Sequence, residues 1–351
     1  MWSYRCTALA LVLAASPAHA NEPKSRPNLT TARRVAAVAV AIVPGILVRG
    51  AGSWMVGEKR TAKRLAITAG IGLGAAVVGG LPLGLSGANP YSIEPGVPLL
   101  VAGTGALLTT WWADIAVAAG IDGGRARSAP PWSVELATLW LHDPYRERGL
   151  GRLTGTLELG RIGLAAATMI DAETDARDAE LEVRTRLLGE PAGGGVVLDG
   201  SRLFIRTAGR VHRDDVDRVT LATAAIEIAG RLDLIHLDRV LEGTFAELST
   251  GVGVERASYG GGTIHDHSSL LLATFAWGVY VGGFGEATIL YDHRRDSLAG
   301  GGAASHTAGF VGAIGGSLDL RVAPHIAVRG QLEYGNAWVS TFAIRYCGGR
   351  P

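Results

Sequence analysis

The residues best suited to chemistry are a His-Asp-His-Ser-Ser cluster at 265–269. On a β-strand, His265 and His267 would point to the same side and could share a metal ion. A histidine close to a serine such as Ser268 could also hydrolyse a lipid at a barrel surface. Three consecutive glycines at 260–262 precede the cluster and predict a loop, where histidines are commonly solvated. We therefore predict no catalytic residue and no cofactor, and retain His265 and His267 as the candidates for metal binding.

A second charged cluster lies at 291–296, with the sequence Tyr-Asp-His-Arg-Arg-Asp. Arg294 and Arg295 are candidates for surface binding, because the guanidinium group of arginine forms paired hydrogen bonds with phosphate. The phosphates of lipopolysaccharide would be a suitable partner. The alternative is a solvated loop whose charges pair locally, and the sequence leaves both interpretations open.

Alternation of apolar and charged residues dominates the second half of the chain. Between residues 180 and 187, Leu181, Val183 and Leu187 fall on one side of a strand, and acidic and basic residues fall on the other. Charges of both signs are interleaved on the polar side, so they can form ion pairs inside a lumen of roughly eight to ten strands. We predict a lumen charge network that contains Glu182, Arg184, Arg186, Arg206, Glu227, Arg231, Arg329 and Glu333.

The segments with this alternation predict about ten strands between residues 151 and 346. They lie near 153–171, 179–189, 200–212, 217–232, 238–256, 269–282, 284–293, 305–322, 325–335 and 337–346. The first segment changes phase partway, so it requires a bulge or a division into two strands. Many segments reach the roughly 9–11 residues that a tilted strand needs to cross a bilayer. A barrel of this size is narrow or plugged, because a wide aqueous pore needs about 16–18 strands.

Two long apolar segments precede the strands, at 65–87 and 96–120. Proline and glycine residues between them mark a turn, so the pair predicts a helical hairpin. Gly70 and Gly74 lie one helical turn apart and predict the contact face between the two helices. The glycines and basic residues at 49–64 match neither a P-loop nor a dinucleotide fingerprint, and we interpret them as the flank of a membrane-active helix.

The first 20 residues have the features of a secretory signal peptide: Arg5, a short apolar stretch and a small-x-small site at 18–20. The mature chain would then contain one cysteine, Cys347, which excludes an internal disulfide and predicts a free thiol on a C-terminal tail. The formal net charge of +1 gives no basic footprint for nucleic acid. These features predict export across the inner membrane and no nucleic-acid partner.

The signal peptide and the alternating segments from 151 to 346 together resemble the outer-membrane β-barrel proteins of Gram-negative bacteria. The final segment, from Trp338 to Tyr346, is similar to the aromatic-ended last strand of such proteins, although the chain continues through 347–351. The resemblance implies an integral protein of the outer membrane, with the lipid bilayer as its environment and lipopolysaccharide as a further partner. Its role would be structural, adhesive or that of a narrow channel.

We therefore expect a helical part followed by a β part. The ranges are a signal peptide at 1–20, a glycine-rich apolar helical segment with the hairpin at 21–120, a linker at 121–150, an antiparallel up-and-down transmembrane β-barrel of about 8–12 strands at 151–346, and a tail at 347–351. Two alternatives remain open. One is a barrel-borne lipid hydrolase that uses His265 or His267 with Ser268. The other is an inner-membrane helical hairpin that carries a soluble periplasmic β-sandwich, because a sandwich shows the same alternation of faces.

Overall fold

The computed structural model describes residues 30–85, 90–120, 124–142, 147–171, 176–214, 218–237, 239–260, 264–292, 313–334 and 337–349. The chain divides into two compact units. The helical unit contains the residues up to 123 together with the segment 233–244, and the barrel unit contains 124–232 and 245–351. The predicted signal peptide at 1–20 and the surface candidates Arg294 and Arg295 lie outside the described residues.

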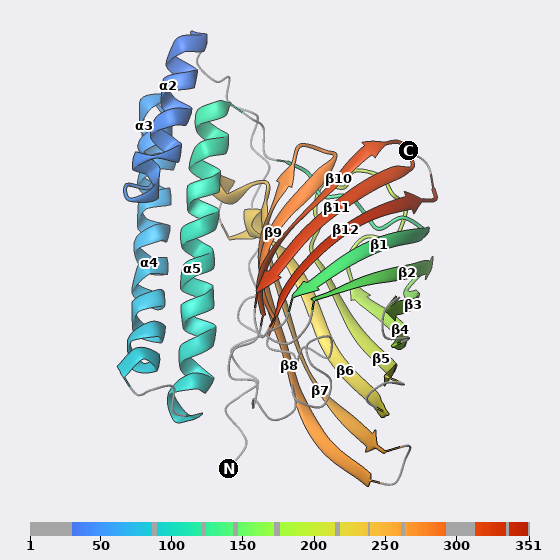
Figure 1. Cartoon of the computed structure of the whole chain (residues 1–351). Helices are drawn as coiled ribbons and strands as arrows, with labels where there is room; N and C mark the ends of the chain where they lie inside the picture. Colours follow the sequence, from blue (N-terminus) through green and yellow to red (C-terminus); the bar gives the residue numbers. More distant parts are fainter. Residues whose placement is uncertain are drawn as a thin grey trace. The chain divides into compact units, whose positions relative to one another are not determined.

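The helical unit contains the predicted hairpin, formed by two long helices (Figure 1). Its α-helices are α2 (Thr31–Ile42), α3 (Ala51–Met55), α4 (Lys59–Leu85) and α5 (Pro90–Ala119), and its 3₁₀ helices are η1 (Pro44–Ile46), η2 (Leu234–His236) and η3 (Arg239–Leu241). Lys59–Leu85 and Leu99–Ala119 are long and apolar enough to cross a membrane.

Glycines bring the backbones of α4 and α5 into direct contact. A Cβ atom at Gly72 would lie 2.9 Å from the carbonyl oxygen of Gly103. One at Gly96 would lie 2.9 Å from the carbonyl oxygen of Gly79. Neither position has room for a side chain, so the absence of Cβ atoms is what lets the helices approach this closely.

The contact face predicted from Gly70 and Gly74 is wrong, because a Cβ atom at either position would meet nothing within 4 Å. α4 carries glycines on more than one of its sides, and the contacting residues Gly72 and Gly79 are spaced by seven positions. A spacing of four identifies a stripe of small residues, but it does not tell which stripe faces the partner helix.

Alanine substitutions should distinguish the two sets of glycines. In Gly103→Ala the added methyl group would press against the backbone of α4, and we expect a loss of about 1–3 kcal/mol in stability. Gly70→Ala is the matched control, because its methyl group meets nothing and alanine favours the helix by up to about 1 kcal/mol. Thermal unfolding in detergent, followed by far-ultraviolet circular dichroism, should shift in opposite directions. Shifts of the same sign would contradict the packing of α4 on α5.

The barrel unit is a closed sheet in which the described residues form twelve strands, arranged in the order of the sequence, with β12 pairing to β1 (Figure 1). The strands are β1 (Trp132–His142), β2 (Glu147–Leu159), β3 (Ile162–Asp171), β4 (Arg177–Leu188), β5 (Arg202–Asp214), β6 (Val219–Asp233), β7 (Thr244–Tyr259), β8 (Ile264–Val281), β9 (Gly285–Asp292), β10 (Ala313–Ala323), β11 (Ile326–Tyr334) and β12 (Trp338–Cys347). The predicted fold class, helices followed by an antiparallel up-and-down barrel, is confirmed. A β-sandwich is excluded, because it needs two packed sheets.

The predicted linker at 121–150 contains β1 and the start of β2, so this boundary is wrong. The inward residues Leu139 and Leu141 of β1 are buried, and the outward residues Leu136 and Trp140 are exposed. Both faces are thus apolar, which removes the alternation that reveals the other strands. The predicted segment 153–171 is the hairpin of β2 and β3, as its change of phase allowed.

The barrel has two rims. The rim where β1 begins and β12 ends is termed the proximal rim, and the rim where β1 ends and β12 begins is the distal rim. Cys347 is the last residue of β12 and is buried, so it does not belong to a tail at 347–351. Its backbone N–H donates to the carbonyl oxygen of His325 at 2.8 Å, which holds the strand end at the proximal rim.

The outer face of the barrel is apolar between two groups of aromatic residues. At the proximal rim the rings of Trp132 and Tyr346 lie 5.6 Å apart, and at the distal rim those of Tyr334 and Trp338 lie 4.7 Å apart. Trp338 and Tyr346 of β12 are eight positions apart, which is roughly 26 Å along a strand. The exposed apolar residues of the barrel include Val134, Leu136, Leu153, Leu157, Leu181, Val252, Val254, Leu271, Leu318, Leu332, Phe342 and Ile344.

Candidate functional site in the barrel lumen

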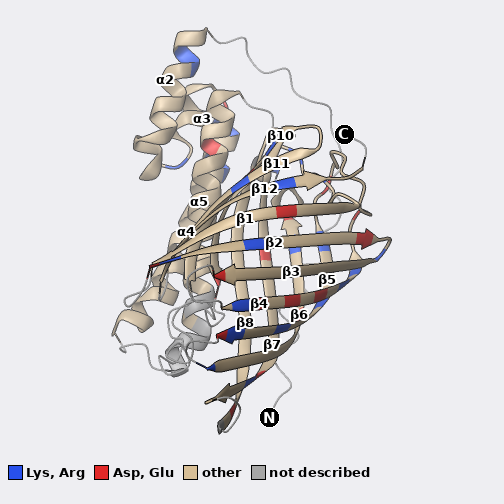
Figure 2. Ribbon diagram, turned by 45° about the vertical axis from the view of Figure 1, so that its right-hand side comes forward, with Lys and Arg blue, Asp and Glu red and all other residues tan. Residues whose placement is uncertain are grey.

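Charged side chains connect neighbouring strands inside the barrel, and Figure 2 shows basic and acidic residues interspersed along the strands. On β4, Oε1 of Glu182 lies 2.9 Å from Nε of Arg184. Oε2 of Glu182 lies 3.6 Å from Nη1 of Arg206 on β5. Arg206 also pairs with Glu227, the residue directly opposite it on β6. Four of the predicted network residues therefore form one cluster across three strands.

Arg231 is the centre of a second cluster near the proximal rim. Its Nε lies 2.6 Å from Oε1 of Glu247, and its Nη1 lies 2.6 Å from Oε2 of Glu286. The guanidinium group also lies over the ring of Phe245, 3.8 Å from its centroid. Only 7% of the Arg231 side chain is exposed. Two carboxylates and an aromatic ring, rather than water, therefore surround this charge.

A third cluster joins β1, β10, β11 and β12. Nη2 of Arg345 lies 2.7 Å from Oε2 of Glu135 and 2.8 Å from Oδ2 of Asp319. Arg329 approaches the other oxygen of Glu135 at 3.6 Å. The cluster therefore closes the seam between the first and the last strand with opposite charges.

The remaining members of the predicted network lie apart from these clusters. Arg186 pairs with Glu158 at 2.9 Å, and Glu333 accepts a hydrogen bond from Gln331 at 2.8 Å. The structure thus divides the predicted residues among several groups rather than joining them in one chain. Glu286, which the prediction omitted, falls on the polar side of the predicted strand 284–293, so the same alternation could have identified it.

Two segments cross the barrel mouth at the proximal rim. Residues 124–131 lead into β1, yet Nη1 of Arg127 donates to the carbonyl oxygen of Gly283 in the β8–β9 turn at 2.7 Å. Nη2 of Arg127 donates to the carbonyl oxygen of Gly194 in the β4–β5 loop, 189–201, at 2.9 Å. β8 and β9 lie across the closed sheet from β1, so these contacts span the mouth. Residues 124–131 and 189–201 are together termed the plug.

The plug has backbone pairing and an apolar core of its own. The N–H of Val197 donates to the carbonyl oxygen of Ala126 at 2.9 Å, which ties the two plug segments together. Ala126 and Val197 pack against Phe245 and Tyr280, whose rings lie 4.7 Å apart. The same Phe245 supports Arg231. The plug is therefore fastened to the lumen wall by apolar contacts as well as by hydrogen bonds.

A cavity of about 450 Å³ is lined jointly by plug residues and by the lumen wall. Among its described lining residues, eight are arginines and four are acidic. The arginines are Arg125, Arg127, Arg184, Arg202, Arg231, Arg321, Arg329 and Arg345, and the acids are Glu135, Glu158, Glu286 and Asp319. The cavity is therefore positively charged.

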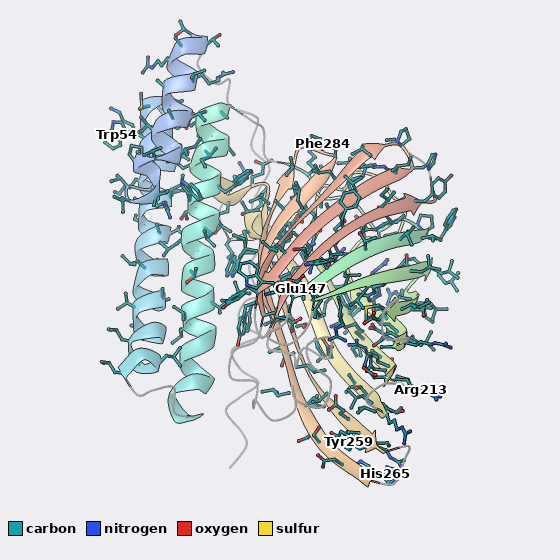
Figure 3. The ribbon with its side chains drawn as sticks, in the orientation of Figure 1. Trp54, Glu147, Arg213, Tyr259, His265 and Phe284 are labelled. Atoms are coloured by element: carbon teal, nitrogen blue, oxygen red, sulfur yellow. The ribbon has the colours of Figure 1, made fainter. Side chains whose placement is uncertain are left out.

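The His-Asp-His-Ser-Ser cluster lies within β8 and not in a loop, which corrects the prediction. In Figure 3, His265 is near the end of the β7–β8 hairpin. Its Nδ1 lies 3.0 Å from the hydroxyl oxygen of Ser258, whereas Ser268 lies 3.4 Å from Glu255. Among the described residues no carboxylate pairs with His265, and no group of three His, Cys, Asp or Glu residues could hold a metal ion. The structure does not bring His265 and Ser268 together as a hydrolase would need.

The chain matches no protein-family model and no curated protein. Solved structures similar to it include the KdgM porin in complex with disordered oligogalacturonate, with 6% identity, a TM-score of 0.39, and coverage of 62% of this chain and 99% of that one. The NanC porin has 9% identity, a TM-score of 0.38 and coverage of 61% and 98%. The Acinetobacter baumannii outer membrane protein Omp33 has 8% identity, a TM-score of 0.34 and coverage of 65% and 100%.

Proposed function

We propose that the protein is an integral outer-membrane β-barrel of a Gram-negative bacterium, with the role of a narrow channel whose lumen is closed at rest. The outer face supports the membrane environment, because exposed apolar side chains lie between aromatic pairs at the two rims. In a closed barrel every strand is paired on both sides, so no unpaired backbone N–H or C=O group of a sheet edge is exposed to lipid. The predicted signal peptide supplies the route of export.

The plug across the proximal mouth is the observation that carries the functional part of this proposal. Arg127 joins the plug to two separate walls of the barrel. Behind it, ion-paired side chains project from the walls into the lumen. An unpaired charge away from water is costly, so these pairs should stay interlocked. Ions and small solutes would then pass only when the plug and its pairs rearrange.

Protein purified with detergent from the outer-membrane fraction should show little or no steady current in planar lipid bilayers. Arg127→Ala removes both hydrogen bonds that fasten the plug to Gly194 and Gly283, and we expect frequent open events from this variant. Arg256→Ala is the matched control, because Arg256 is an exposed residue of β7 and its removal should leave the native trace unchanged.

Two outcomes would contradict the closed lumen. Large, stable channels from the native protein would mean that the lumen is an open pore. A native trace from Arg127→Ala would mean that the plug is not what blocks the current. In the second case, the triple replacement of Arg184, Arg206 and Arg231 by alanine would test whether the ion pairs alone close the lumen.

A further inference from the structure

We propose that the cavity lined by the plug and the lumen wall binds a small polyvalent anion, one that carries phosphate or carboxylate groups. This inference goes beyond the role of a closed channel, because binding in the cavity does not require that anything passes through it. It rests on the distribution of charge among the eight arginines of the cavity.

Five of these arginines contact carboxylates of the barrel wall. The pairs are Arg184 with Glu182, Arg202 with Glu247, Arg231 with Glu247 and Glu286, Arg329 with Glu135, and Arg345 with Glu135 and Asp319. The carboxylates compensate the positive charge of these five arginines, so this part of the wall needs no anionic ligand for charge balance.

The other three arginines, Arg125, Arg127 and Arg321, contact no carboxylate among the described residues. Arg127 and Arg321 both donate to the carbonyl oxygen of Gly194, at 2.9 and 3.2 Å. Their guanidinium groups are therefore neighbours, and burial together with the positive charge of Arg321 lowers the pKa of Arg127. Arginine nevertheless remains protonated in proteins. Two arginines of the plug and Arg321 of β10 thus place positive charge in the cavity without an acid in contact with them among the described residues.

An anion is the ligand that this arrangement would stabilise. Guanidinium groups present several donors in a plane and match the paired oxygens of phosphate and carboxylate. An anion between Arg125, Arg127 and Arg321 would offset the repulsion between them, and a polyvalent anion would offset more of it. The cavity volume of about 450 Å³ lies within the range of roughly 300–1,000 Å³ that is usual for small-molecule sites.

The test is isothermal titration calorimetry on the full chain in non-ionic detergent, with pyrophosphate in one arm and citrate in the other. We expect saturable binding of at least one of them, weakened by added salt. Arg125→Gln removes an exposed cation whose side chain makes no hydrogen bond to the described residues, so the fold should be unaffected. The double variant Arg125→Gln/Arg321→Gln should lose roughly tenfold in affinity. Arg256→Gln removes the same charge outside the cavity and should bind as the native protein does.

Native affinity in the double variant, or an equal loss in Arg256→Gln, would overturn the proposal, because the attraction would then be unspecific. Absence of saturable binding of both probes by the native protein would overturn it as well. Preference for pyrophosphate or for citrate would identify phosphate or carboxylate as the recognised group. If the native protein bound a probe saturably and also formed large channels, the proposal of a closed lumen would be contradicted and the proposal of an anion site would be supported.

Discussion

Arg231→Ala should destabilise the barrel by about 3–5 kcal/mol, because removing one partner of a buried ion pair leaves the other charge uncompensated. Here two acidic residues would lose this partner, Glu247 and Glu286, each 2.6 Å from the guanidinium group in the native protein. Glu247 would keep only the more distant Arg202, at 3.5 Å. The substitution would also remove the group that lies over Phe245. Phe245 belongs to the apolar core of the plug. The substitution should therefore destabilise the plug at the proximal mouth as well as the lumen wall.

Urea unfolding in lipid vesicles, followed by tryptophan fluorescence, would measure this effect. Arg152→Ala is the matched control within the same barrel, because the Arg152 side chain is 41% exposed and lies 3.5 Å from Glu180. An exposed pair of this kind contributes at most about 1 kcal/mol. Equal losses in the two variants would show that Arg231 is not a buried centre of charge.

A compensating variant separates charge from packing. Combining Arg231→Met with Glu286→Gln removes the cation and its bidentate partner together, leaves Glu247 paired with Arg202, and keeps a long apolar side chain over Phe245. Replacement of a buried ion pair by uncharged groups is often neutral, so most of the stability should return. If the combined variant stays as unstable as Arg231→Ala, the loss comes from packing and not from uncompensated charge.

Most strands of the barrel could be predicted because the side chains on one face are charged or polar and those on the other face are apolar. β4 shows this most clearly, since Leu181 is exposed on the outer face and Glu182 pairs with arginines in the lumen. β1 lacks this contrast, because its inner residues Leu139 and Leu141 are as apolar as its outer ones. A strand whose two faces have the same polarity carries no period-2 signal.

The plug could not be predicted, because nothing periodic marks it. The segments 124–131 and 189–201 are rich in glycine and proline, which indicates only turns and loops. The bonds from Arg127 to Gly194 and Gly283 join residues that are 67 and 156 positions distant in the chain. Such contacts exist only after the sheet has closed, so local sequence patterns do not record them.

Adjacency in sequence also misled the choice of a partner for His265. Neighbouring residues of a strand alternate between the two faces of the sheet, and the contact that His265 makes is with Ser258 of the preceding strand. The charged residues of the lumen were easier to identify, because a single strand already shows which of its side chains share a face. Which of them pair depends on strand register, as for Arg206 opposite Glu227.

Asp114 of α5 organises the helical unit in a way that the sequence shows only as one acid within an apolar helix. Its side chain is completely buried. Oδ2 accepts hydrogen bonds from the backbone N–H groups of Gly50 and Gly52, both at 3.1 Å. Oδ1 accepts from the backbone N–H of Ser53 at 2.7 Å and from its hydroxyl at 2.6 Å. The backbone donors at the start of α3 therefore bind an anion, and that anion is a carboxylate of the same chain.

Asp114→Ala should accordingly cost the helical unit at least about 3 kcal/mol, because several buried donors would lose their acceptor at once. Asp114→Asn keeps one acceptor oxygen and should be intermediate. Thr109→Ala is the control on the same helix: Thr109 is also buried, but its hydroxyl donates only to carbonyl oxygens of its own helix, such as that of Gly105 at 2.9 Å. In thermal unfolding in detergent, the midpoint should fall most for Asp114→Ala, less for Asp114→Asn and least for Thr109→Ala. If Asp114→Ala unfolded at the same temperature as Thr109→Ala, the carboxylate would not be what fixes the start of α3 to α5. The position of α3 would then depend on apolar contacts alone.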